Sequence, residues 1–181
     1  MNNHLSLIDT NILVIIIANQ IKPLIETDKI FIIDIEALNI SKILISPSIL
    51  EETCNLITLN FGSNKWLKIL DLLVFDNFYH LIPNREDDIK SIRTIQNNFP
   101  TVWTYNSFKK MNVHKGIGWA DAKFILSAKE IYESMNFDKF SILTLDKDLQ
   151  KALKSKRIGL KDYVIDENLV SKPTYRIKPV K

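Results

Sequence analysis

Hydrophobic residues in this chain form short continuous runs that alternate with longer segments of helical periodicity. The run Leu5–Ile8 ends at Asp9 and leads into a second apolar stretch, Asn11–Asn19. Lys42–Ile45 is a similar run, and Ser46-Pro47-Ser48 follows it as a typical helix start, because proline fits the first helical turn. Each pair predicts a buried strand that leads into a helix.

The remaining segments continue this alternation. Further helices are predicted at Asp28–Leu38, Ile49–Asn60, Lys65–Phe75, Arg85–Phe99 (with Ile89, Ile92 and Ile95 inward), Trp119–Met135 and Asp146–Lys154. Further strands are predicted at Phe78–Ile82, Ser141–Leu145 and Tyr163–Ile165. Pro100–Gly118 lacks clear periodicity and is predicted to be a loop or a short irregular element. The pattern indicates one α/β domain over residues 1–170, with helices on both faces of a mainly parallel sheet, and an extended basic tail at 171–181.

Composition and charge narrow the class only slightly. The 24 Lys and Arg residues outnumber the 21 Asp and Glu residues, and a net charge of +3 permits a nucleic-acid partner without indicating one. Cys54 is the only cysteine, which excludes an internal disulfide, and nothing in the sequence resembles a Cys/His zinc cluster. Asp9 and Asn11 interrupt the N-terminal apolar run, so that we expect neither a signal peptide nor a membrane span, and a cytoplasmic location.

Three acidic residues stand at predicted strand-to-helix junctions. Asp9 ends the first strand, Asp146 ends a late one, and Glu52 lies in the first turns of the helix after the second strand. In a parallel sheet with right-handed crossovers, all these junctions lie at the same carboxyl edge. The sequence therefore predicts that these distant acids converge.

Asp121 is a fourth acid in an unusual position. It shares a predicted helix face with Phe124, Ile125, Ala128 and Tyr132, which otherwise form the buried stripe. A carboxylate among buried residues costs free energy unless a cation or hydrogen bonds compensate it. Gathered at one edge, four carboxylates would repel one another unless a divalent cation lay between them, and an all-oxygen ligand set favours Mg²⁺ or Mn²⁺.

A simpler interpretation exists for each acid alone. Asp9, Asp121 and Asp146 all stand near predicted helix starts, where an aspartate caps free amides and interacts favourably with the helix dipole. Glu51 and Glu52 both flank the apolar face of their helix, so helical geometry does not separate them. The combination of residues, rather than any single one, indicates a metal site.

Four short motifs carry these acids. They are Leu7-Ile8-Asp9-Thr10-Asn11, Ile45-Ser46-Pro47-Ser48-Ile49-Leu50-Glu51-Glu52, Trp119-Ala120-Asp121-Ala122 and Leu143-Thr144-Leu145-Asp146-Lys147-Asp148. In this order they resemble the motifs of PIN-domain nucleases, including the toxin ribonucleases of toxin–antitoxin pairs, from about residue 5 to residue 153. In that family a Ser or Thr precedes the catalytic Glu by six residues, a spacing that selects Glu52.

The resemblance implies a PIN-like three-layer α/β/α sandwich and a set of site residues. Asp9, Glu52, Asp121 and Asp146 would be the catalytic metal ligands, with Asp148 as an additional or water-mediated ligand. The cofactor would be Mg²⁺ or Mn²⁺, and metal-activated water would cleave RNA internally to leave 5′-phosphate ends.

The same resemblance gives Asn11 and Thr144 supporting roles, in which they orient carboxylates through hydrogen bonds. The alternatives are a helix-start residue for Asn11 and an ordinary β-branched strand residue for Thr144. Implied partners are an RNA substrate, an antitoxin protein and a second copy of the chain. Residues 60–118 exceed the corresponding part of compact toxins, and we expect them to bind substrate, cover the site or form an oligomer contact.

Two other functional classes fit parts of this pattern. A catalytically inactive PIN-like module for RNA binding or assembly would keep the fold without the chemistry. A phosphatase of the haloacid dehalogenase type requires a second Asp two residues after the first, where this chain has Asn11.

Two basic stretches could contact phosphates, although such runs are usually solvated faces. The first contains Lys109, Lys110, His114 and Lys115 near Trp103, Tyr105 and Phe108, and the second contains Lys151, Lys154, Lys156, Arg157 and Lys161.

Overall fold

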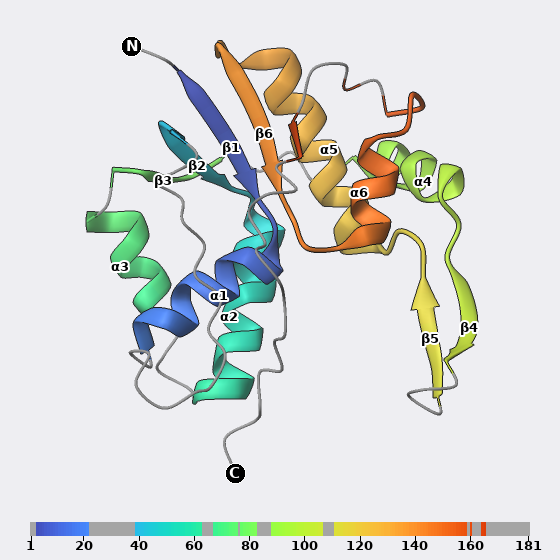
Figure 1. Ribbon diagram of the computed structural model, residues 1–181, viewed down its shortest axis with the longest axis horizontal. Coiled ribbons are helices and arrows are strands. Elements are labelled where there is room, and N and C mark those ends of the chain that lie inside the picture. Colours follow the sequence, from blue (N-terminus) through green and yellow to red (C-terminus); the bar gives the residue numbers. More distant parts are fainter. Residues whose placement is uncertain are drawn as a thin grey trace.

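Five parallel strands form the central sheet in the part of the chain that the structure describes (Figure 1). The computed structural model describes residues 3–21, 39–62, 67–75, 77–82, 88–106, 111–158, 160 and 164–165. The strands of the sheet are β1 (His4–Ile8), β2 (Lys42–Ile45), β3 (Tyr79–Leu81), β6 (Lys139–Leu143) and β7 (Val164–Ile165). All of their pairings are parallel, which confirms the predicted sheet type.

The strand order is β3-β2-β1-β6-β7, so the side of the sheet on which successive strands are added changes between β1 and β6. From β1 the chain moves to β2 and β3 on one side, whereas β6 and β7 lie on the other side. In open α/β sheets, such a reversal leaves a crevice at the carboxyl ends of the two neighbouring strands, where ligands usually bind. The order therefore places the ends of β1 and β6 at the expected binding position.

Helices cover both faces of this sheet, as in a three-layer α/β/α sandwich (Figure 1). They are α1 (Thr10–Ile21), α2 (Pro47–Phe61), α3 (Leu67–Phe75), α4 (Ile89–Asn98), α5 (Trp119–Ser134) and α6 (Lys147–Leu153). The first three connect strands on the β2 side, and α5 and α6 flank β6. Right-handed crossovers that run in opposite directions from the centre of the sheet put these two groups on opposite faces.

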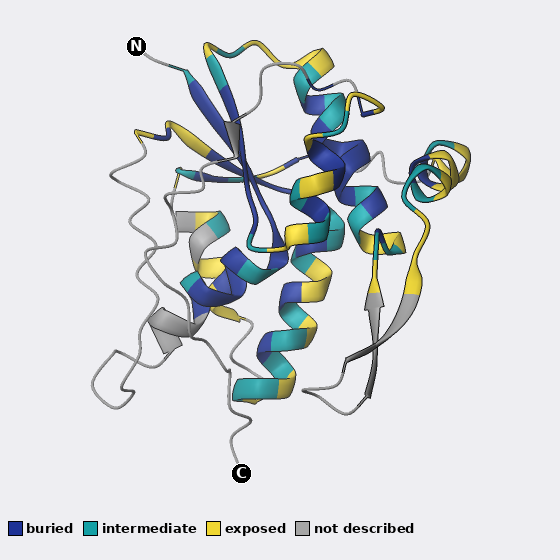
Figure 2. Cartoon of the chain, turned by 45° about the vertical axis from the view of Figure 1, so that its right-hand side comes forward, coloured by how far each residue is buried: buried dark blue, intermediate teal, exposed yellow. Residues whose placement is uncertain are grey.

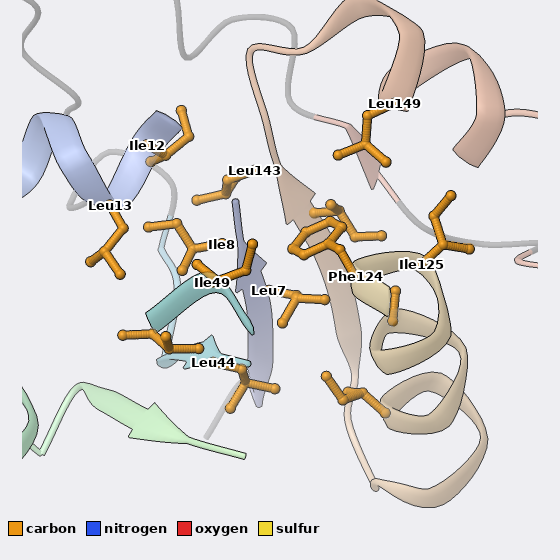
Figure 3. Packing of buried hydrophobic residues seen from close by; sticks show 14 of the residues in the cluster. Leu7, Ile8, Ile12, Leu13, Leu44, Ile49, Phe124, Ile125, Leu143 and Leu149 are labelled. Atoms are coloured by element: carbon orange, nitrogen blue, oxygen red, sulfur yellow. The ribbon is translucent and has the colours of Figure 1, made fainter. Parts of the chain in front are cut away.

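The hydrophobic core lies on both sides of β1, every residue of which is buried (Figure 2). Leu7 and Ile8 of β1 pack between side chains of α1, α2, α5 and α6, including Phe124, which is fully buried (Figure 3). A strand that is buried on both faces carries a continuous apolar sequence instead of an alternating one. This burial explains why the run around Leu7 predicts a central strand.

The segment Pro100–Gly118 differs from its prediction as a loop or a short irregular element. It contains β4 (Val102–Asn106) and β5 (Met111–Lys115), which pair with each other as an antiparallel two-stranded ribbon. Because the two strands pair only locally and stand apart from the central sheet, neither has the long apolar run of a buried strand. The ribbon joins α4 to α5 (Figure 1).

Several boundaries also differ from the sequence predictions. Ile92 and Ile95 of α4 are buried as expected, but Ile89, the first residue of the helix, is 54% exposed. Strand β6 ends at Leu143, two residues before the predicted end, so that Asp146 follows a short connection. The predicted helix 28–38 and the tail 171–181 lie outside the described residues. Within the described ranges, no helix is long and apolar enough to cross a membrane.

Candidate active site

Asp9 is the buried centre of the acidic edge. It follows β1 directly, and its backbone N–H donates to the carbonyl of Leu143 at 2.9 Å, so the ends of β1 and β6 are held together. The residue is only 7% exposed. Asp9 thus lies at the junction between β1 and β6 where the strand order reverses.

Three hydrogen bonds hold the Asp9 carboxylate. Its Oδ1 accepts the backbone N–H of Thr10 at 2.7 Å, and its Oδ2 accepts from Asn11 Nδ2 at 2.7 Å and from the Thr144 hydroxyl at 2.5 Å. Asn11 also accepts the backbone N–H of Leu145 at 3.1 Å through its Oδ1. Asn11 and Thr144 therefore fix this carboxylate between the two central strands.

Burial is the main reason that the pKa of Asp9 is raised to about 6. Hydrogen bonds from Thr144 and Thr10 oppose this rise, whereas the negative charges of Asp121 and Asp146 add to it. Repulsion from these two residues requires that they lie within electrostatic reach of Asp9. In the described part of the chain, no Lys, Arg or His forms an ion pair with Asp9.

Asp146 caps the N-terminus of α6. Its Oδ1 accepts the backbone N–H groups of Asp148 at 2.7 Å and Leu149 at 2.9 Å, and the side chain is exposed. Its own backbone N–H donates to the Thr144 hydroxyl at 3.0 Å. Since that hydroxyl also donates to Asp9, Thr144 links the Asp9 carboxylate to the backbone of Asp146.

Glu52 reaches the same edge from α2. Its Oε2 accepts the hydroxyl proton of Thr10 at 2.7 Å, and Thr10 follows Asp9 in the chain. Glu51 and Glu52 are both exposed, so burial does not distinguish them. The contact with Thr10 distinguishes Glu52 from Glu51, because it connects Glu52 to the segment that holds Asp9.

Asp121 stands in the first turn of α5. Its Oδ2 accepts the backbone N–H of Gly118 at 2.8 Å, as expected of a carboxylate near a helix start. Phe124, Ile125 and Ala128 on its predicted face are buried, while Asp121 itself is half-buried. It therefore lies at the first-turn end of the buried stripe, and its negative charge contributes to the raised pKa of Asp9.

Asp148 is tied to the base of the β4–β5 ribbon. Its Oδ2 accepts the backbone N–H of Gly116 at 3.2 Å, and its Oδ1 lies 3.8 Å from Lys151 Nζ. Gly116 has φ +108°, and a Cβ at this position would lie 2.7 Å from the Pro100 carbonyl oxygen. Glycine is therefore required where the ribbon passes Asp148.

These residues suit a hard divalent cation by their chemistry. Every candidate ligand is a carboxylate oxygen, and the most buried one gains no positive partner from the described residues. The same ranges contain no group of three His, Cys, Asp or Glu already placed to hold an ion. Capping bonds hold Asp121 and Asp146, and without a cation their charges repel that of Asp9.

The sequence reasoning missed two residues of this edge. Thr10 supplies both a backbone N–H to Asp9 and a hydroxyl to Glu52, and its position between Asp9 and Asn11 was the available signal. Gly116 was missed because its role depends on the close approach of Pro100, which no local sequence pattern indicates.

No family model matches the chain, and no curated protein matches its sequence.

Proposed function

We propose that this protein is a Mg²⁺- or Mn²⁺-dependent endoribonuclease of the PIN type. The observation that carries the proposal is the buried Asp9 carboxylate at the β1–β6 junction. It is held by three hydrogen bonds, has no cationic partner among the described residues, and is repelled by Asp121 and Asp146. Such a carboxylate is best compensated by a bound cation.

Asp9, Glu52, Asp121 and Asp146 are the proposed ligands, with Asp148 as a further or water-mediated one. A bound divalent cation supplies the Lewis acidity that activates water and stabilises charge on a phosphoryl group. Asn11 and Thr144 keep the Asp9 carboxylate in one orientation, and Thr10 holds Glu52 towards the same edge. With a pKa of about 6, Asp9 is mostly ionised at neutral pH and accepts a cation there without first losing a proton.

RNA is the proposed substrate because of the resemblance of the four acidic motifs to those of PIN-domain ribonucleases. The same resemblance extends the proposal to a cytoplasmic toxin that a partner antitoxin protein restrains, and to a homodimer. The products would carry 5′-phosphate and 3′-hydroxyl ends.

The test is incubation of the purified protein with total RNA and Mg²⁺ or Mn²⁺, followed by mapping of the cleavage ends. We expect cleavage with 5′-phosphate ends by the wild type and none by Asp121→Asn. The asparagine oxygen can still accept the Gly118 N–H, so this variant should unfold at the same temperature or a higher one in metal-free buffer.

Asp71→Asn is the matched control, because Asp71 is an exposed acid on α3. It should cleave like the wild type. Equal cleavage by Asp121→Asn would contradict the assignment. RNA binding by a wild type that never cleaves would instead identify an inactive binding module.

A further inference from the structure

A groove of about 390 Å³ lies where α4, α5 and the turn after α6 meet. Ile95, Leu126 and Ile158 line it and are buried, so its floor is apolar. Lys90 and Arg157 line it as exposed cations. An apolar floor with cationic walls suits a ligand that has both a flat apolar part and negative charge.

A third cation, Lys129 of α5, adds to the positive charge of these walls. Among the described residues that line the groove, Asp88 is the only acid. Both of its carboxylate oxygens accept from Ser91, at 3.0 Å from the backbone N–H and at 2.5 Å from the hydroxyl, and it caps α4. The lining therefore carries three cations against one acid that is already engaged in capping.

One end of the groove adjoins the acidic edge. Arg157 Nη1 donates to the carbonyl of Asn98 at 3.4 Å, and the next carbonyl, that of Phe99, accepts the N–H of Ile117 at 3.3 Å. Ile117 stands between the two glycines whose amides bind Asp148 and Asp121. A chain that leaves the acidic edge beside α5 can therefore enter the groove at its Asn98 end.

The groove then continues along α5, away from the acids. Lys129 follows Asp121 by eight residues on this helix, which corresponds to about 12 Å along its axis. Both α4 and α6 lie beside α5 (Figure 1). A strand of RNA held across the acidic edge would meet Arg157 first and Lys129 and Lys90 further on.

We propose that this groove binds single-stranded RNA next to the cleavage site, with phosphates on Lys90, Lys129 and Arg157 and an unstacked base on the apolar floor. The identity of the ligand rests on the proposed function. Single strands are favoured over duplexes, because only an unpaired base can leave its stack to contact apolar side chains.

The test measures binding without cleavage. Fluorescence anisotropy of a short labelled single-stranded RNA is followed in EDTA at several salt concentrations, for the wild type and for Lys90→Ala/Lys129→Ala/Arg157→Ala. Loss of three phosphate contacts should lower the slope of log K against log salt by about 2, since each contributes about 0.7 on single strands. Affinity near physiological salt should fall by at least about tenfold.

A charge-matched triple variant, Lys42→Ala/Lys68→Ala/Lys139→Ala, controls for net charge. Lys42 and Lys139 stand at the amino ends of their strands, opposite the acidic edge, and Lys68 is on α3. This variant should keep the wild-type slope within about one phosphate contact. The single variant Lys90→Glu, at an exposed position, should weaken binding even if the triple groove variant folds poorly.

The outcomes separate the groove from the catalytic proposal. If both triple variants lose affinity equally, or if neither does, the groove assignment is overturned, even where the wild type cleaves RNA with Mg²⁺. If RNA binding depends on the groove but no divalent cation supports cleavage, the groove stands and the nuclease proposal fails. Equal affinity for a 5′-mononucleotide would overturn RNA binding in favour of a nucleotide site.

Discussion

Asp9 should make the metal-free protein less stable as the pH rises. Its pKa is raised from an ordinary value of 3.8 to about 6, so the folded state retains a proton that the unfolded chain releases. The stabilisation is complete below about pH 4 and is lost as the pH passes through about 6. A shift of about 2 units at about 1.4 kcal/mol per unit gives a loss of about 3 kcal/mol.

The measurement compares wild type with Asp9→Asn by urea unfolding in EDTA between about pH 4 and pH 7. An amide at this position faces donors from Asn11 and Thr144, so the variant has a cost that is constant with pH. The free energy of unfolding of the variant minus that of the wild type should therefore rise by about 2.4 kcal/mol across this range, which is most of the full change.

Asp71→Asn supplies the control for this comparison, because its carboxylate is exposed and pairs only with Lys68 at 3.2 Å in the described part of the chain. Its difference from the wild type should change by less than about 1 kcal/mol over the same range. If the difference in free energy of unfolding between Asp9→Asn and the wild type stayed constant or fell with pH, the claim that burial disfavours the charged form of Asp9 would be refuted.

Three further substitutions separate structural from chemical roles. Asp146→Asn keeps an N-cap, so it should lose RNA cleavage but retain its free energy of unfolding in urea within about 0.5 kcal/mol. Asp146→Ala should lose cleavage and also about 1 kcal/mol of stability. If both variants lost stability but still cleaved RNA, capping α6 would be the sole role of Asp146. Glu52→Gln should reduce RNA cleavage by at least about tenfold, and Glu51→Gln should not. Equal effects would refute the assignment of Glu52, rather than Glu51, as the ligand on the basis of its contact with Thr10. Gly116→Ala should lower the free energy of unfolding in urea by about 1–3 kcal/mol, because its Cβ would clash with the Pro100 backbone and φ is positive. An unchanged free energy of unfolding would refute the requirement for glycine at this position.

The sequence was most informative where burial is two-sided. Central strands such as Leu5–Ile8 show continuous apolar runs, and the strand-to-helix junctions that follow them locate Asp9 and Asp146 at one edge. The ribbon of β4 and β5 was wrongly predicted as a loop or a short irregular element, since two strands that pair only with each other lack such runs. Local periodicity thus identifies elements that are packed in the core better than elements that stand apart from it.

The candidate site followed the same division. Helical geometry alone could not separate Glu51 from Glu52, because the distinguishing contact comes from Thr10, 42 residues earlier in the chain. The tie between Gly116 and Asp148 was also unpredictable, since it joins residues 32 positions apart through a backbone amide. Contacts of this kind depend on tertiary structure and leave no periodic signal in the sequence.

Calorimetric titration of the metal-free protein with Mn²⁺ at neutral pH tests the proposed metal site most directly. The wild type should bind with an affinity that falls at least about tenfold in Asp9→Asn and in Asp121→Asn, since each removes a proposed ligand charge. Asp71→Asn, on α3, should bind as the wild type does. Absence of Mn²⁺ binding by the wild type at millimolar concentration, or equal affinity in all four proteins, would contradict a cation site at the carboxyl ends of β1 and β6.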